Sequence, residues 1–65
     1  MTYYMIYTDG HSPCTDEGRI KTLKQAVAER NSLMQEDRSL GIGGLISYEI
    51  WKVTERDGVR IEEQV

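Results

Sequence analysis

The sequence predicts an α+β fold in which one helix packs on one face of a small sheet. Three observations predict it: a β-rich segment at the N-terminus, a capped amphipathic segment in the middle, and two β-rich segments joined by a tight turn at the C-terminus. We expect the order β-α-β-β, with a small antiparallel or mixed three-stranded sheet. A chain of 65 residues is expected to form a single domain over residues 1–65.

The first strand is predicted over Thr2 to Thr8, a segment rich in aromatic and β-branched residues. Asp9-Gly10 is a turn signal that ends this strand. The residues that follow, up to Gly18, are rich in Gly, Ser, Pro and Asp. We therefore predict that Asp9 to Gly18 form a loop.

The helix is predicted to begin after Thr22, a favourable N-cap residue. Gln25 lies three residues later and completes a capping box, which satisfies two backbone N–H groups. Side chains expected on the buried face recur at helical spacing: Leu23, Ala26, Val27, Arg30, Leu33 and Met34. The helix should end near Asp37 or Arg38, because the glycine-rich segment 41–44 follows.

Two further strands are predicted near the C-terminus, from about Leu45 to Thr54 and from Val59 to Val65. Asp57-Gly58 lies between them and is a favoured hairpin turn. We therefore expect these two strands to pair in an antiparallel hairpin.

The length of this turn decides which residues face each other across the hairpin. With a two-residue loop, Thr54 faces Ile61, and Lys52 shares a face with Ile61. With Arg56 added to the loop, Val53 faces Ile61 and Lys52 moves to the other face. We expect the second, bulged turn, because burying a lysine costs several kcal/mol unless it is well paired.

The second strand has large apolar side chains on both faces, because Tyr48 and Ile50 alternate with Trp51 and Val53. One helix can cover only one face of a small sheet. In the expected register, Trp51 packs beneath three helix residues: Leu23, Val27 and Met34. Tyr48 and Ile50 are then a surplus apolar pair, which must either contact another molecule or remain exposed to solvent.

This surplus pair, Tyr48 and Ile50, is the expected centre of a protein interface. Tyr4 extends the pair with an aromatic ring from the first strand. A charged rim is expected around them, formed by Lys52, Arg60 and Glu62. Since a chain of this size buries only about 60% of its unfolded surface, self-association is an expected source of stability.

Composition and charge narrow the choice of partners. Eleven acidic residues against eight basic ones give a formal net charge of -3, without the basic stripe that tracks a phosphate backbone. Nucleic acid is therefore not an expected partner. Cys14 is the only cysteine, so no disulfide can form within the chain. The N-terminus lacks the pattern of a signal peptide or membrane span, and we expect a soluble cytoplasmic protein.

No catalytic residue, metal site or cofactor is predicted. His11 and Cys14 lie in one loop, but zinc needs three or four ligands and a cysteine nucleophile needs a positioned base. We interpret this loop as polar surface with an incidental thiol. The glycines of segment 41–44 leave a helix and enter a strand, whereas a phosphate cradle leads from a strand into a helix. We therefore expect that the protein is not an enzyme.

Three segments together carry a resemblance: Tyr3-Tyr4-Met5-Ile6-Tyr7, the capped helix from Thr22 to Glu36, and the strand from Tyr48 to Thr54. In size and element order the chain resembles the small orphan proteins of bacteriophages and other mobile elements. The resemblance implies a non-enzymatic binder that blocks a host factor or a defence enzyme. It also implies a symmetric oligomer, and it transfers no functional residue.

Two functions are therefore open. The first is a non-enzymatic binding protein that self-associates and inhibits or modulates a host protein. The second is an oligomer that sequesters a small ligand or a nucleotide in pockets between its subunits. In that second case aromatic rings would stack on a base, and Arg19, Lys21 or Arg60 would hold phosphate.

Overall fold

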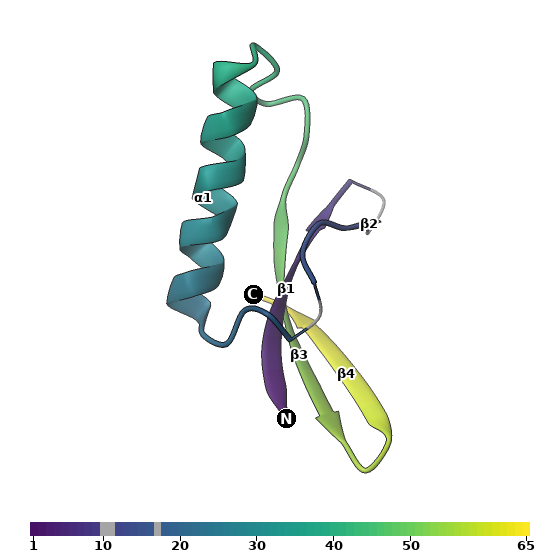
Figure 1. Cartoon of the computed structure of the whole chain (residues 1–65). Coiled ribbons are helices and arrows are strands. Elements are labelled where there is room, and N and C mark those ends of the chain that lie inside the picture. The colour runs from purple at the N-terminus through teal and green to yellow at the C-terminus, as the bar shows by residue number, and fades with distance from the viewer. Residues whose placement is uncertain (10–11, 17) are drawn as a thin grey trace.

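The computed structural model describes residues 1–9, 12–16 and 18–65, and this part of the chain contains one helix and four strands (Figure 1). The elements, in chain order, are β1 (Thr2–Thr8), β2 (Ser12–Pro13), α1 (Leu23–Ser39), β3 (Glu49–Arg56) and β4 (Val59–Gln64). The predicted α+β class is confirmed. The short strand β2 extends the predicted order β-α-β-β to β-β-α-β-β.

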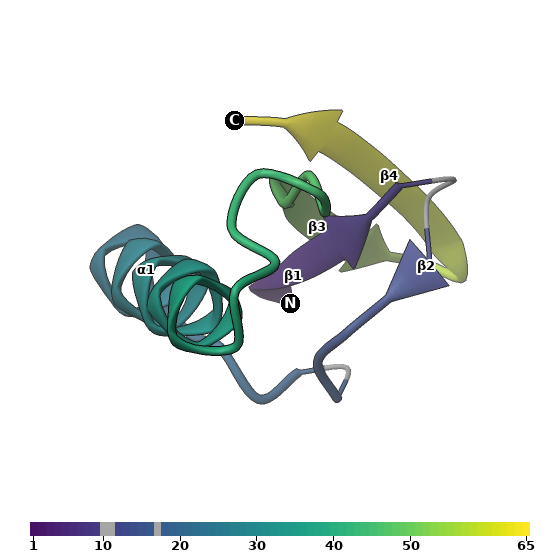
Figure 2. The same cartoon turned by 90° about the horizontal axis from the view of Figure 1, so that it is seen from above.

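The four strands form one antiparallel sheet in the order β2-β1-β3-β4. The sheet curls into half a barrel, with α1 and β4 on opposite sides of β1 when seen from above (Figure 2). The molecule is elongated, 44 × 23 × 18 Å, because the helix and the β3–β4 hairpin extend in opposite directions (Figure 1). In the described part of the chain, no helix has the length and apolar character needed to cross a membrane.

The strand β1 has the predicted bounds, but the predicted loop after it contains a strand. Ser12 and Pro13 form β2, where Thr8 pairs with Ser12 and Tyr7 pairs with Pro13. A two-residue strand has no alternation of apolar and polar residues, so nothing in the sequence pattern distinguishes it from a loop. Gly10 and the predicted loop residue His11 lie outside the described residues.

The helix α1 begins as predicted, after the N-cap Thr22, whose hydroxyl accepts the N–H of Gln25 at 3.1 Å. The capping box differs in one detail, because the Gln25 side chain accepts the N–H of Lys21 at 3.5 Å, one residue before the N-cap. The helix runs to Ser39, slightly past its predicted end. Gly41 then takes a positive φ of 78°, which suits a glycine beyond a helix C-terminus.

The predicted bulged hairpin is wrong. Arg56 pairs with Val59, so Asp57-Gly58 is a two-residue turn, and both turn residues have positive φ, 52° and 78°. Lys52 consequently shares a face with Val59 and Ile61. A lysine on this face carries no burial cost, because the face is open: Val59 and Ile61 are 57% and 52% exposed and Lys52 is exposed as well.

The face of β3 that packs against the helix is also the opposite of the predicted one. Ile50 is buried with Ile6, Ile20 and Ala26, and Tyr48 packs against this cluster. Ile6 and Ile50 face each other across β1 and β3, on the face that we call the helix face. Leu23 and Met34, predicted to cover Trp51, are instead 40% and 45% exposed.

A second apolar cluster occupies the other side of the sheet, which we call the inner face. It contains Tyr3, Met5, Tyr7 and Val53, all buried, with Trp51 packed against them. The tyrosine–tryptophan pair meets edge to face, with ring centroids 6.2 Å apart and an interplanar angle of 85°. These side chains are sheltered within the single chain, because the sheet curls over its own inner face.

The four apolar side chains of the predicted two-faced strand are therefore all half-buried or buried in a single chain: Tyr48, Ile50, Trp51 and Val53. The expectation that one face needs a second molecule to cover it is wrong. A helix is not the only cover in this fold, because the curl of the sheet shelters its inner face. The strand itself also starts later than predicted, at Glu49 rather than near Leu45.

Candidate functional site: the outer strand β4

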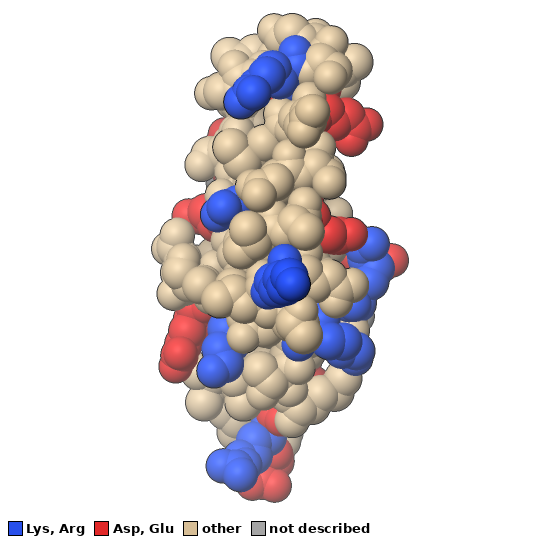
Figure 3. Space-filling view, turned by 90° about the vertical axis from the view of Figure 1, so that its left-hand side faces the viewer, with Lys and Arg blue, Asp and Glu red and all other residues tan. Residues whose placement is uncertain are grey.

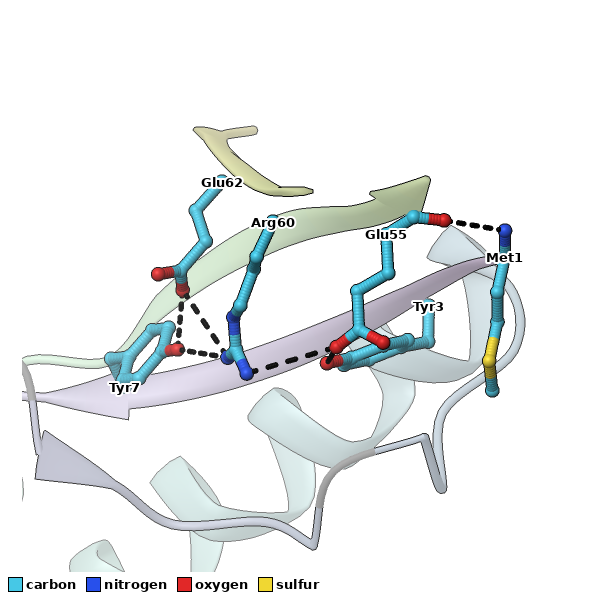
Figure 4. Close-up of polar contacts among 6 residues, drawn as sticks. All are labelled: Met1, Tyr3, Tyr7, Glu55, Arg60 and Glu62. Atoms are coloured by element: carbon cyan, nitrogen blue, oxygen red, sulfur yellow. Dashed lines mark hydrogen bonds and ion pairs between the residues drawn. The ribbon is translucent and has the colours of Figure 1, made fainter. Parts of the chain in front are cut away.

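A polar cluster on the inner face joins β4 to the rest of the sheet (Figure 4). The Tyr7 hydroxyl donates to Glu62 Oε1, and the Tyr3 hydroxyl donates to Glu55 Oε1 at 2.8 Å. Arg60 lies between the two pairs, with guanidinium nitrogens 3.9 Å from Glu55 Oε1 and 3.7 Å from Glu62 Oε1. It also donates to the Tyr7 hydroxyl at 3.4 Å. We call these five residues the anchoring cluster.

The pleat of the strands brings the anchoring cluster together. Tyr3 and Tyr7 are four residues apart on β1, so both side chains point to the inner face. Arg60 lies directly opposite Glu55 across the hairpin, and Glu62 is two residues further along β4 on the same face. The cluster therefore connects β4 to β1, although these two strands are not neighbours in the sheet.

The hydrogen bond between Tyr7 and Glu62 depends on a protonated phenol. Burial raises the pKa of Tyr7 first, and the hydrogen bond to the Glu62 carboxylate raises it further. Arg60 acts in the opposite direction, because its positive charge favours the phenolate. The net effect is a raised pKa, so that at neutral pH the phenol is a stable donor that holds β4 in place.

The outer edge of β4 has no neighbouring strand among the described residues. The N–H of Val65 donates to Ile50 of β3 at 2.9 Å. Since backbone groups alternate along an antiparallel strand, Ile61 and Glu63 also point toward β3. The residues between them point their N–H and C=O groups to the outer edge: Arg60, Glu62 and Gln64.

The helix face of β4 carries exposed apolar side chains next to this edge. Val59 and Ile61 are 57% and 52% exposed. The helix does not cover them, because among the described residues α1 contacts β1 and β3 but not β4. We call the outer backbone edge of β4, with these two side chains, the β4 edge.

A groove of about 470 Å³ lies at the other end of the molecule, where the helix ends, and its lining includes Met34, Arg38, Ile46 and Tyr48. The Tyr48 hydroxyl donates to Asp37 Oδ2 at 2.6 Å. This hydrogen bond raises the pKa of Tyr48 to about 12, with burial as a further cause. The groove has no cluster of like charges, since Asp37 and Arg38 both line it.

The predicted interface residues do not form one surface. Tyr4 and Tyr48 are half-buried on the helix face, and Ile50 is buried there. Lys52 is exposed on the same face. The other two predicted residues, Arg60 and Glu62, lie on the inner face in the anchoring cluster. The role of all six residues in an interface stays a prediction. Of the six, Arg60 and Glu62 belong to β4, and Lys52 pairs with Glu63 of β4.

Five residues of this region were not predicted as site residues: Tyr3, Tyr7, Glu55, Val59 and Ile61. The two tyrosines are spaced to share a face of β1, which is a signal the sequence contains. With the two-residue turn, the same alternation places Arg60 and Glu62 on the face of Glu55. The correct turn length would therefore have predicted the Glu55, Arg60 and Glu62 part of the anchoring cluster, whereas the two tyrosines also require the pairing of β1 with β3.

The first loop shows no sign of an activated nucleophile in its described residues. The Cys14 thiol donates to the Ile6 carbonyl at 3.2 Å. Its pKa is raised, first because neighbouring atoms displace water and then by the negative charge of Glu29. A reactive thiol needs the opposite shift. In the described ranges, no three side chains of His, Cys, Asp or Glu are placed to hold a metal ion.

Charged side chains are mixed on the helix side of the molecule. Figure 3 shows Lys and Arg dispersed between Asp and Glu there, rather than gathered in one patch. No protein family, curated protein or solved structure matches the chain.

Proposed function

We propose that this chain is a non-enzymatic binding protein that accepts a β-strand of another polypeptide at the β4 edge. The observation that carries the proposal is the outer edge of β4, which adjoins the exposed side chains of Val59 and Ile61. Adding a strand to such an edge gives affinity through backbone hydrogen bonds, and side chains beside the edge give selectivity. The proposed activity is the inhibition or modulation of a host protein, of the kind that proteins of mobile elements carry out.

Two features support the use of β4 as a binding strand. The anchoring cluster holds β4 before any partner arrives, so little conformational entropy would be lost on binding. The solvent-accessible surface area of the chain is 4553 Å². This is slightly more than the value of about 4,200 Å² that is typical of a compact monomer of its mass. A partner strand would cover part of this surface.

The small-ligand alternative has less support. Arg19 pairs with Glu29, and Arg60 lies between Glu55 and Glu62. A phosphate group at either arginine would therefore face a carboxylate. The groove near Tyr48 lies at a helix C-terminus, where the helix dipole disfavours an anion.

Affinity capture with matched variants tests the proposed function. Ile61→Lys places a charge in the middle of the β4 edge, a common way in which natural proteins block strand addition. Leu45→Lys is the matched control, because Leu45 is an exposed apolar residue, 72% exposed, that lies outside the sheet. We expect wild type and Leu45→Lys to capture the same protein from a bacterial lysate, and Ile61→Lys to lose it.

The two contrary results have distinct meanings. Capture that survives Ile61→Lys would place the binding surface elsewhere on the molecule. Equal loss with both variants would show that any added charge prevents binding, and would remove β4 from the proposal.

A further inference from the structure

We propose that a second copy of this chain is a partner of the β4 edge, paired antiparallel about a two-fold axis that passes through Ile61. The inference rests on the proposed function, because both require β4 to accept a strand. It adds the identity of the strand and its register. In the resulting dimer the two sheets form one continuous sheet.

Symmetry limits the registers to a few. A two-fold axis perpendicular to the sheet keeps each face on its own side. Residues that lie opposite each other must therefore share a face, and the axis passes midway between one residue of β4 and the same residue of the partner subunit. Below, an axis "through" a residue means an axis at this midpoint. The outward backbone groups of Arg60, Glu62 and Gln64 supply the new hydrogen bonds. The central candidates for the axis are therefore Arg60, Ile61 and Glu62.

Charge selects one of these registers. An axis through Arg60 places two arginines directly opposite each other, and an axis through Glu62 does the same with two glutamates. Like charges opposite each other destabilise a strand pair. An axis through Ile61 instead places Arg60 opposite Glu62 of the partner subunit, and the symmetry repeats this pair on the other side of the axis.

The same register covers the apolar side chains of the helix face. Ile61 faces its own symmetry mate across the axis, and Val59 lies diagonally beside it. Both are more than half exposed in the single chain. Glu63 falls opposite Val59 of the partner subunit, and its charge already lies across from Lys52 of its own hairpin.

The fold leaves room for this pairing and closes the competing one. The helix lies over β1 and β3, away from β4, so a second sheet can extend beyond β4 without meeting it (Figure 1). Pairing of β4 with the opposite edge of another copy would give an open chain of subunits. That edge offers little to pair with: its edge strand β2 has only two residues, Ser12–Pro13, and the rest of β1 is covered, because Ile20 accepts the N–H of Tyr4 at 2.9 Å.

Disulfide trapping tests the register. In a Cys14→Ser background, Ile61→Cys places two thiols across the axis, in a non-hydrogen-bonded pair with Cα atoms about 4.5 Å apart, which a disulfide can bridge. Val59→Cys is the matched control on the same strand and face. In this register its thiol is offset from its symmetry mate by four residues, about 13 Å, which is too far to bridge.

We expect a disulfide-linked dimer with Ile61→Cys and none with Val59→Cys, on non-reducing electrophoresis after equilibration in a glutathione buffer. Bridging by Val59→Cys, or equal bridging by both variants, would overturn the register. Light scattering of the wild type checks the association itself, with Ile61→Lys expected to shift it to monomer. A wild type that stays monomeric at millimolar concentration would overturn the second copy as partner, and the proposed function would still be decided by its own capture experiment.

Discussion

The two edges of the sheet end in different ways. Beside β1, the chain closes its own edge: Tyr4 donates its N–H to Ile20, Ile6 accepts the N–H of Cys14, both at 2.9 Å, and β2 pairs with the end of the strand. Beside β4, the sheet ends without a further strand in the described part of the chain. One edge is thus part of the core, and the other is part of the surface.

This difference is the reason for proposing β4 as the strand at which a partner binds. Natural proteins commonly protect an edge strand with charges, bends or a covering loop. The β1 edge has the covering loop. The β4 edge has charges of both signs, Arg60 and Glu62, placed two residues apart and held by the anchoring cluster. Under the proposed function, such an edge would repel a strand of like charge pattern and accept a complementary one.

The largest expected effect comes from removing core packing beside the closed edge. Ile20→Ala removes a fully buried side chain that packs on the helix face with Ile6 and Ala26. We expect a loss of about 2–5 kcal/mol in the free energy of unfolding. Ile61→Ala, at the open edge, is the control and should cost less than about 1 kcal/mol in the monomer. Urea unfolding at low protein concentration measures both, and equal losses would contradict the distinction between the two edges.

A smaller, pH-dependent effect is expected at the open edge, because a phenol anchors it. Tyr7→Phe removes the donor to Glu62 and should cost about 1 kcal/mol at neutral pH, since the hydrogen bond is only partly buried. The pKa of Tyr7 is raised in the folded state, so its contribution is present below the unfolded value of about 10 and is lost as pH rises through the folded value.

The stability difference between wild type and Tyr7→Phe should therefore shrink as the pH rises above 10. Urea unfolding of both proteins across this range measures it. Tyr48, whose pKa is raised to about 12, is present in both proteins. Its effect on the free energy of unfolding at high pH is therefore the same in both and cancels in the comparison. A stability difference that stays constant with pH would show that loss of the phenolic oxygen destabilises the protein independently of the ionisation of Tyr7.

Local signals in the sequence predicted most of the elements. The aromatic segment of β1, the N-cap Thr22 and the Asp57-Gly58 turn each specify an element through nearby residues alone. What failed was the assignment of faces. The assignment of faces depended on whether the face that carries Lys52 is buried, and its burial depends on how much of the sheet the helix covers. The position of the helix and the curl of the sheet are determined by contacts between residues far apart in the chain, which a single sequence does not reveal.

The candidate site was predicted only in part, because it too depends on contacts between residues far apart in the chain. Arg60 and Glu62 were identified as charged residues near a binding surface, but their partners Tyr3, Tyr7 and Glu55 come from two other strands. Only the strand order and the two-residue turn bring these side chains together. The bulged register predicts the pair on β4, Val59 and Ile61, on the same side as Trp51 and the helix, yet both are exposed, because apolar alternation in a strand does not say whether a helix covers it.

The smallest expected effect is local and concerns single amide groups of β4. At low protein concentration, the N–H groups that point to β3, those of Ile61 and Glu63, should already be protected from hydrogen exchange by the hairpin. Addition of a second strand protects the outward-pointing groups of Arg60, Glu62 and Gln64. Their exchange should slow as the protein concentration rises, while that of Ile61 and Glu63 changes little. Exchange measured by NMR on the same sample makes the inward amides an internal control. Equal concentration dependence of the two sets would indicate general stabilisation of the hairpin, and would separate it from strand addition at the open edge.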